Sequence, residues 1–191
     1  PDEKLLAIGL VSGEIQLWDW AKNIQTSTLQ GHTGKISKIL FSGNGRFIYS
    51  ASFDQHVIVW NAASQKSVQD IPAHSDPVND IAVSSDGRTL ISVSDDQLVR
   101  VWDLAAGTKT YEIRRSGKLK AVALSSDDVY IAVGGEAGLI WQTNVRTRQL
   151  RTDPIPVTER IWSLQYTDND EKLLAGIGNG EDQTYEASKP R

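Results

Sequence analysis

The chain has 191 residues, of which 39% are hydrophobic and 23% charged, and its net charge is −4. This length and composition fit a globular domain with its own core and exclude a disordered chain. The acidic balance gives no overall basic field for nucleic acid or an anionic membrane, and no apolar run reaches the ~20 residues that span a bilayer. The absence of cysteine excludes disulfide frameworks and thiolate metal sites.

The chain contains no methionine and begins with Pro1. Translation requires an initiator, so we expect this sequence to be a segment or a processed piece of a longer protein. No charged and then apolar stretch of the signal-peptide type opens it, and we expect a cytoplasmic location.

Short segments of β type follow one another along the chain, separated by turn residues. The apolar stretch EIQLW (14–18) belongs to the first unit. The next unit contains four candidate strands rich in branched or aromatic residues, at 35–42, 46–52, 56–61 and 66–71. The following unit repeats them at 77–84, 88–94, 98–103 and 108–113. Gaps of about three to five residues suit antiparallel hairpins, so each unit is predicted to be a four-stranded sheet.

Tryptophan marks the period of this repetition. Trp18, Trp60 and Trp102 are evenly spaced, at intervals of 42, and Trp141 follows after an interval of 39. Turn sequences begin with a similar period, at Ser42, Ser84, Ser125 and Thr167. The sequences DEKLLAIGLVSGE and DEKLLAGIGNGE, near the two ends, start at positions 2 and 170, an offset of 168 or four times 42. The shorter last tryptophan interval predicts that a strand of the fourth unit comes about two residues early.

The pattern predicts an all-β fold, because no segment shows sustained helical periodicity of its apolar residues. Strands at this spacing also occur in β-sandwiches. A fixed period close to 42, with four strands in each unit, favours radial repetition instead. We therefore predict a β-propeller of four-stranded antiparallel blades.

Two of the units resemble the WD repeat, a Trp-Asp motif of roughly forty residues. The markers stand in the family's order, with GH at 31–32, SASFD at 50–54 and VWN at 59–61, then AH at 73–74, SVSDD at 92–96 and VWD at 101–103. Degenerate copies flank these two units, so the resemblance covers nearly the whole chain. It implies a propeller that usually has seven blades. Such a ring needs roughly 290 residues at this period. Either the rest of the ring lies outside this chain or an unusual smaller ring closes here, and we favour the first.

The resemblance divides the chain into five units, of which the first and last are partial blades. They are a partial blade at 1–30, blades at 31–72 and 73–114, a degenerate blade at 115–155 and a partial blade at 156–191. Pro1 to Lys4 resemble a hairpin turn. The fourth unit has RRSGK in place of Gly-His and GGEAG at the Asp position, and the first has VSGE there. We expect the first and fourth units to be less rigid than the second and third.

In the WD family, one His, Ser, Asp and Trp form a hydrogen-bonded network inside a blade. Carried over, the resemblance implies two such networks, His32, Ser50, Asp54 and Trp60, and His74, Ser92, Asp96 and Trp102. A buried Trp N–H needs an acceptor, a Ser hydroxyl can accept and donate, and a neutral imidazole can link Ser to Asp. The network then leaves no buried polar group unpaired, which would otherwise cost about 1–3 kcal/mol each.

The same Ser, His and Asp could also suggest a catalytic triad. A triad needs an accessible nucleophile and an oxyanion hole, and the chain has no G-x-S-x-G elbow. Ser50 and Ser92 stand in the middle of predicted strands, and an active site has no reason to recur once per structural unit. We therefore expect a structural role for these residues and no enzyme activity in this chain.

Three further motifs have simpler explanations. GIGNG at 176–180 resembles a dinucleotide loop but lacks the following helix, so we expect a turn. His32, His56 and His74 lack the paired spacing of metal ligands, so neither a metal nor a cofactor is expected. The basic run RRSGKLK at 114–120 could contact an acidic partner, although such runs are more often solvated loops.

Partner-binding positions follow from the family, where they lie just before the turn Asp and at the start of the innermost strand. Here they are Phe53, Asp95, Lys35, Ser37, Pro77, Asn79, Lys118, Lys120, Arg160 and Trp162. Phe53 and Trp162 are the strongest candidates because aromatic residues are enriched among interface hot spots. Packing against the neighbouring blade is the alternative role for both.

The resemblance implies a non-enzymatic scaffold or docking module for protein partners, which could include other domains of a longer chain. The alternative is a propeller that serves as an accessory domain of a larger enzyme, such as a hydrolase, protease or kinase, with the catalytic part outside this chain. A small-ligand site in a central channel is a third possibility without specific support. Nucleic acid and membrane are not expected partners of this segment.

Overall fold

Five antiparallel sheets follow one another along the chain in the computed structural model, which describes residues 5–167, 169–178 and 182–186. The first nine strands are β1 (Leu5–Gly9), β2 (Ile15–Asp19), β3 (Ile24–Leu29), β4 (Ile36–Phe41), β5 (Phe47–Ser52), β6 (His56–Asn61), β7 (Lys66–Pro72), β8 (Val78–Val83) and β9 (Thr89–Ser94). The other nine are β10 (Leu98–Asp103), β11 (Thr108–Arg114), β12 (Leu119–Leu124), β13 (Tyr130–Gly135), β14 (Leu139–Asn144), β15 (Ile155–Pro156), β16 (Ile161–Thr167), β17 (Lys172–Ile177) and β18 (Asp182–Glu186). Each strand pairs with the strand before or after it, in the sheets β1–β3, β4–β7, β8–β11, β12–β15 and β16–β18.

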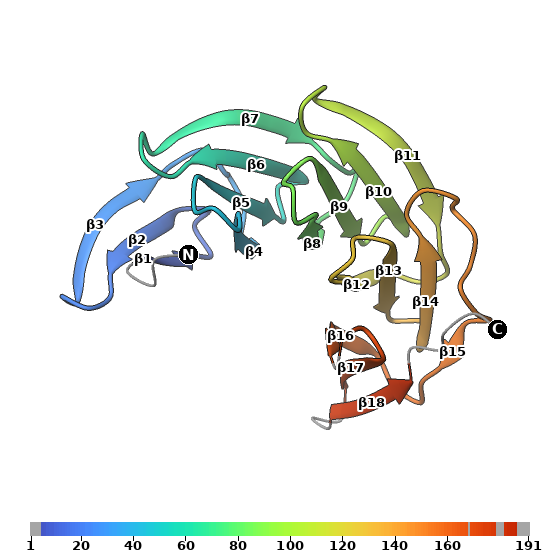
Figure 1. Cartoon of the computed structure of the whole chain (residues 1–191). Coiled ribbons are helices and arrows are strands. Elements are labelled where there is room, and N and C mark those ends of the chain that lie inside the picture. Colours follow the sequence, from blue (N-terminus) through green and yellow to red (C-terminus); the bar gives the residue numbers. More distant parts are fainter. Residues whose placement is uncertain (1–4, 168, 179–181, 187–191) are drawn as a thin grey trace.

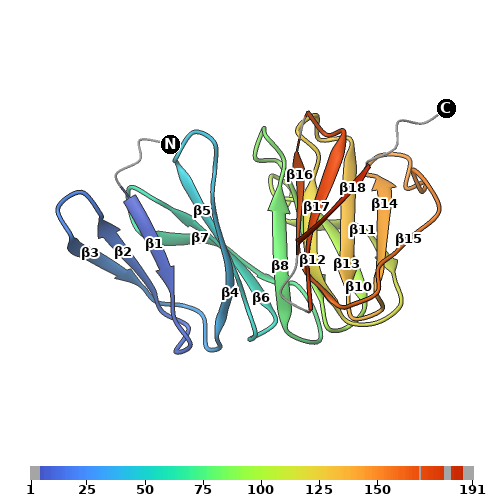
Figure 2. The same ribbon diagram turned by 90° about the horizontal axis from the view of Figure 1, so that it is seen from below.

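The five sheets stand side by side in an open arc (Figure 1). Strands β4, β8, β12 and β16 lie toward the centre of the arc, and β3, β7 and β11 lie on its outer rim. Figure 2 shows the sheets from another direction, with their turns gathered at two opposite ends. This radial arrangement of antiparallel sheets confirms the prediction of an all-β fold built from propeller blades. A seven-blade ring stays a prediction.

The second and third sheets lie where the sequence pattern predicts them. All eight strands from β4 to β11 begin and end within one residue of the predicted boundaries. Their turns explain this agreement, because Gly45 and Gly87 have φ angles of 69° and 71°, a region that other residues rarely adopt. In the next sheet the corresponding turn residue is Asp128, with φ of 59°. Its carboxylate accepts hydrogen bonds from the backbone N–H and the hydroxyl of Ser85 in the neighbouring sheet.

The core consists of four apolar clusters, each shared by two neighbouring sheets. Ile15 and Leu17 of the first sheet pack with Ile58 and Trp60 of the second. The next three gaps between sheets are filled in the same way. Because every sheet except the first and last is covered on both faces, the middle strands are almost entirely apolar and buried.

The prediction that Trp141 occupies the same place in its sheet as Trp102 is wrong. Trp102 pairs with Leu90 across β10 and β9, and the pair at this place in the next sheet is Thr143 with Ile131. Strand β14 keeps the regular period after β10, so it does not come early. Trp141 stands two positions before the repeat position, and because side chains alternate along a strand it still faces the same side. There it is buried against the third sheet.

Candidate partner-binding site

A chain of hydrogen bonds crosses the second sheet from a turn to its interior. His32 Nδ1 lies 2.8 Å from Asp54 Oδ2, and His32 Nε2 lies 2.8 Å from Ser50 Oγ. The Trp60 indole N–H donates to the same Ser50 oxygen at 2.8 Å. The carboxylate requires a proton on Nδ1, so we assign Nε2 as the acceptor of the Ser50 hydroxyl proton. Every polar atom of the chain of bonds therefore has a partner.

The third sheet contains the same chain of bonds. His74 Nδ1 lies 2.9 Å from Asp96 Oδ2, its Nε2 lies 2.8 Å from Ser92 Oγ, and Trp102 Nε1 donates to Ser92 at 3.0 Å. Burial lowers the pKa of His74, although the nearby Asp96 carboxylate acts in the opposite direction. The lowered pKa favours the neutral imidazole of His74, which is the form that can accept the hydroxyl proton of Ser92. We call these two sets of four residues the braces.

The Asp–His–Ser order of each brace resembles a hydrolytic triad, but its surroundings differ. The hydroxyls of Ser50 and Ser92 belong to residues that are 0% exposed, and each already accepts a bond from a buried indole. A triad serine has to be open to its substrate. The braces therefore hold the turn after the second strand of each sheet in place, and they leave no room for a substrate at the serine.

The fourth sheet has a different polar link at the brace positions. Arg115 follows β11 as His74 follows β7, and it donates from Nη2 to Thr143 Oγ1 at 3.0 Å. Burial lowers the pKa of the Arg115 guanidinium. Val133 and Ala137 stand where a complete brace has Ser and Asp. The tryptophan spacing predicts Trp141 as the counterpart of Trp102. This prediction missed the link because the residue at the place of Trp102 in the fourth sheet is Thr143.

Four of the candidate partner residues share a backbone feature. In each sheet from the second to the fifth, the pairing of the two inner strands shifts by one residue, as a β-bulge does. The bulged residues are Ser37, Asn79, Lys120 and Trp162. A bulge leaves the extra residue out of the ladder and redirects its side chain. The bulges therefore aim four candidate side chains at one end of the sheets.

Two of the bulged residues donate to a backbone carbonyl of the next sheet. Ser37 Oγ donates to the carbonyl of Val78 at 2.6 Å, and Asn79 Nδ2 donates to the carbonyl of Leu119 at 2.7 Å. The two acceptors stand at the same place in successive sheets. These bonds join one blade to the next, so neither side chain is free for a partner. The bulge position of the inner strand therefore links neighbouring blades at Ser37 and Asn79, a role that the sequence did not reveal.

Asp95 lies at the centre of a cluster of four candidate residues. Asn79 Nδ2 donates to Asp95 Oδ1 at 2.7 Å, and Lys118 Nζ lies 3.1 Å from Asp95 Oδ2. Lys120 forms a second ion pair with the same carboxylate. Burial tends to raise the pKa of Asp95, but the bonds from Lys120, Asn79 and Lys118 more than offset it and the pKa falls. The structure thus brings these four residues together across the third and fourth sheets.

The exposed side chains at this end of the sheets include two aromatic residues. Phe53 is 42% exposed, and the Lys35 ammonium lies 5.1 Å from the centre of its ring. Trp162 is 52% exposed, and Arg160 beside it is also exposed. Pro77 is half-buried, and its carbonyl accepts the N–H of Asp95.

Sequence reasoning missed one further exposed residue at this end. Val11 is 79% exposed and stands in the turn of the first sheet at the place that Phe53 occupies in the second. The turn is adjacent to the second sheet, because the Leu10 carbonyl accepts the N–H of Ile36. The repeat offset of 42 between Val11 and Phe53 is the signal that could have found it. We call the surface formed by Val11, Lys35, Phe53, Lys118, Arg160 and Trp162 the docking face.

The remaining sequence motifs do not form ligand sites in the described part of the chain. No three His, Cys, Asp or Glu side chains gather there in a way that could hold a metal ion. His56 lies at the surface, 2.7 Å from Asp70. The glycine-rich segment at 176–180 begins inside β17, whose last two residues are Gly176 and Ile177, and its residues 179–180 lie outside the described residues. Residues 1–4, predicted as a hairpin turn, lie outside them as well.

A protein-family model matches two segments of the chain. The family model for the WD domain, G-beta repeat, matches residues 23–61 and 65–103. Each matched segment runs from the outer strand of one sheet through the first three strands of the next, and so contains one complete brace. No curated protein matches the chain. In the described residues, no helix has the length and apolar character needed to cross a membrane.

Proposed function

The chain belongs to the WD-repeat family, and from this membership we propose that it is a non-enzymatic docking module that binds a protein partner on its docking face. WD-repeat domains are in general scaffolds for protein interactions. One observation carries the proposal for this chain, the exposure of Phe53 and Trp162 at 42% and 52% on a rigid support. Large aromatic side chains in water stabilise the folded state little, but they are enriched among the residues that dominate binding energy.

The support for these two aromatic residues comes from the sheets beneath them. Phe53 precedes Asp54, which the brace fixes, and Trp162 is the bulged residue of β16. In the described part of the chain the Trp162 indole N–H has no hydrogen-bond partner, so a partner could accept from it. Lys35, Lys118 and Arg160 lie around them as a polar rim of the kind that surrounds interface cores.

Quantitative affinity capture with the intact protein as bait tests this proposal. The bait Phe53→Ala/Trp162→Ala should lose, by at least about tenfold, the proteins that the wild type retains, because truncating a hot spot costs about 2 kcal/mol or more. Ile24→Ala is the matched control, since Ile24 is 56% exposed at the opposite end of the sheets.

Unchanged capture by the double variant would contradict the proposal. A lowered melting temperature without a change in capture would show instead that Phe53 and Trp162 pack the blades. The accessory-domain alternative stays a prediction, which the flanking sequence tests. A cytoplasmic location is part of the proposal, and cell fractionation tests it.

A further inference from the structure

Two hollows open between neighbouring sheets at the end opposite the docking face. The first, which we call the apolar hollow, lies between sheets β4–β7 and β8–β11 and has a volume of about 530 Å³. The second, the arginine hollow, lies between β8–β11 and β12–β15 and has a volume of about 490 Å³. Both fall within the size range of ligand pockets, about 300–1,000 Å³.

The hollows occupy the same place in two successive gaps. Their lining residues correspond with an offset of 42, and the pairs include Phe47 and Thr89, Val59 and Val101, and Val68 and Thr110. Arg88 lines both hollows. They are therefore adjacent sites on one surface, and a single extended ligand can reach from one to the other.

The walls of the apolar hollow suit a hydrophobic side chain. Phe47, Tyr49, Val59, Val68 and Leu104 line it. Tyr49 is 1% exposed, whereas Val68 on the outer strand β7 is 55% exposed. An aliphatic or aromatic side chain placed here would remove Val68 from water and bury its own surface, at roughly 25 cal/mol per Å².

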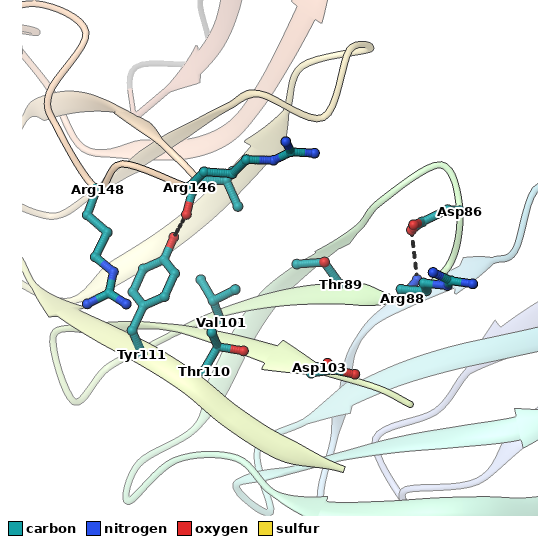
Figure 3. A pocket seen from close by; sticks show the side chains of 10 residues that line it. Asp86, Arg88, Thr89, Val101, Asp103, Thr110, Tyr111, Arg146 and Arg148 are labelled. Carbon is teal, nitrogen blue, oxygen red and sulfur yellow. Dashed lines mark hydrogen bonds between the residues drawn. The ribbon is translucent and has the colours of Figure 1, made fainter. Parts of the chain in front are cut away.

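The arginine hollow has three guanidinium groups without an ion-pair partner in the described part of the chain (Figure 3). Figure 3 shows Arg146 and Arg148 on one wall and Arg88 on the other. None of the three donates a side-chain hydrogen bond to another described residue. The Arg148 guanidinium lies 4.6 Å over the ring of Tyr111, and the Tyr111 hydroxyl donates to the Val145 carbonyl at 2.6 Å. The wall that carries Arg148 is therefore well supported.

The two carboxylates in the arginine hollow are already used by turns. Asp86 Oδ1 accepts the Ser84 hydroxyl at 2.6 Å and the Arg88 backbone N–H at 2.9 Å. Asp103 Oδ1 accepts two backbone N–H groups at 2.9 Å. Both carboxylates therefore have partners within their own turns, and Arg88 also helps to lower the pKa of Asp86. The three guanidinium groups donate no side-chain hydrogen bond to another described residue. On a chain with a net charge of −4, this is a local site for an anionic group.

We propose that the two hollows together bind an extended acidic peptide segment of a partner protein. One aliphatic or aromatic side chain enters the apolar hollow, and Asp or Glu carboxylates meet the guanidinium groups of the arginine hollow. Neighbouring sheets pack about 10 Å apart and an extended peptide advances about 3.3 Å per residue, so the two anchors are three to four residues apart. The proposal concerns a surface separate from the docking face and does not depend on it.

An oriented peptide library tests the proposal on the intact protein. The immobilised protein is incubated with ten-residue peptides that carry a fixed Leu at one position and random residues elsewhere, and the retained peptides are sequenced. The wild type should enrich Asp and Glu at the third and fourth positions from the Leu, by about fivefold or more. A second library with Ala in place of the Leu should be retained much less.

Three variants test whether the two hollows cause the preference for acidic residues and for Leu in the retained peptides. Arg146→Gln/Arg148→Gln should lose the acidic selection and keep the preference for Leu over Ala, whereas Val68→Asp should lose the preference for Leu. Arg46→Gln, which removes an exposed arginine outside both hollows, should leave both unchanged. Thermal melts confirm that each variant folds, and Phe53→Ala/Trp162→Ala should bind the library as the wild type does.

Several outcomes would overturn the proposal. They are retention without acidic enrichment, acidic enrichment that survives in Arg146→Gln/Arg148→Gln, and tighter binding of a single-stranded DNA oligomer than of the selected peptides. The last outcome would assign the arginine hollow to phosphate groups of nucleic acid. Loss of the library by Phe53→Ala/Trp162→Ala alone would assign the peptide to the docking face.

Discussion

Lys38 on β4 places its Nζ 3.0 Å from Oδ1 of Asp80 on β8, so an ion pair joins the innermost strands of two neighbouring sheets. Asp80 is 7% exposed, and its Oδ2 also accepts the N–H of Val122 from the next sheet. One carboxylate therefore connects three successive blades. Burial raises the pKa of Asp80, although Lys38 acts against this shift.

Removal of Lys38 should destabilise the fold because it leaves this buried carboxylate without its counterion. We expect Lys38→Met to lower the free energy of unfolding by about 1–3 kcal/mol, between the values for exposed and buried pairs, since the lysine is partly exposed. Urea unfolding at pH 7 measures the loss. Lys66→Met, at an exposed position on β7, is the control and should be neutral.

The effect of Lys38→Met should shrink as the pH falls. A carboxylate with a raised native pKa binds its proton more readily in the folded than in the unfolded state, so its contribution to stability grows on acidification toward about pH 4. Without Lys38 the pKa of Asp80 rises further. The difference between variant and wild type should therefore be largest at neutral pH, and a constant difference from pH 7 to 4 would contradict this account.

Ser50→Ala and Ser92→Ala should each destabilise the protein, and neither serine should react with a serine-directed probe in the wild type. Each substitution leaves a buried indole N–H and an imidazole without their shared partner, which costs about 1–3 kcal/mol per unsatisfied group. Thermal melts should show a lower melting temperature for both variants. A fluorophosphonate probe should leave the wild-type protein unlabelled, and labelling of Ser50 would show that the brace is an accessible nucleophile.

The pKa of His74 gives stability a second dependence on pH. Because burial lowers it below the unfolded value of about 6.5, the unfolded state binds the proton first on acidification. Stability should therefore fall as the pH drops from about 6.5. The lowered pKa values of Asp54 and Asp96 extend the loss below about pH 4.

Urea midpoints measured from pH 8 to 5 test the role of His74. His74→Gln should be less stable at every pH, but its midpoint should change less between pH 6.5 and 5 than that of the wild type. Ile24→Ala, at an exposed position, removes no titratable group and should keep the wild-type slope. An unchanged slope in His74→Gln would show that other groups cause the acid sensitivity.

The strands of the second and third sheets were predictable because local rules decide them. The turns around Gly45 and Gly87 need a positive φ, and branched residues fill the strands between them, so neighbouring residues alone set the boundaries. The four-residue braces were predicted only through the resemblance to WD repeats. Their members are far apart in the sequence, from His32 to Trp60 in the second sheet, and no local rule joins them.

The place of Trp141 in the fourth sheet was not predicted correctly because tryptophan was used to measure the repeat. Trp141 is buried on the expected face but two positions from the repeat position, and apolar packing tolerates this shift. The cluster around Asp95 was missed for another reason. Lys118 and Lys120 reach Asp95 from the next sheet, and contacts between blades depend on how the sheets stack rather than on sequence spacing.

The missing braces predict a gradient of local stability along the chain. Sheets β1–β3 and β12–β15 lack the complete set of four residues, and the Arg115–Thr143 bond replaces only one link in the second of them. Amide hydrogen exchange should therefore be faster in these sheets than in β4–β7 and β8–β11. Equal protection in all four would mean that apolar packing between sheets, and not the brace, sets local stability.

Lys118 and Lys120 should differ although both pair with Asp95. The side chain of Lys118 is 51% exposed and that of Lys120 is 14% exposed. Exposed ion pairs contribute about 0–1 kcal/mol, whereas removal of one partner from a buried pair costs about 3–5 kcal/mol. We expect Lys118→Met to be nearly neutral in urea unfolding and Lys120→Met to cost about 1–3 kcal/mol.

The same two variants separate structure from binding at this cluster. Lys118 belongs to the docking face, so Lys118→Met should weaken partner capture while the melting temperature stays constant. Lys120→Met should lower the melting temperature first, because the Asp95 carboxylate then loses its most buried cation. Equal losses of stability in both variants would show that the two ion pairs are equivalent. Unchanged partner capture by Lys118→Met would remove Lys118 from the docking face.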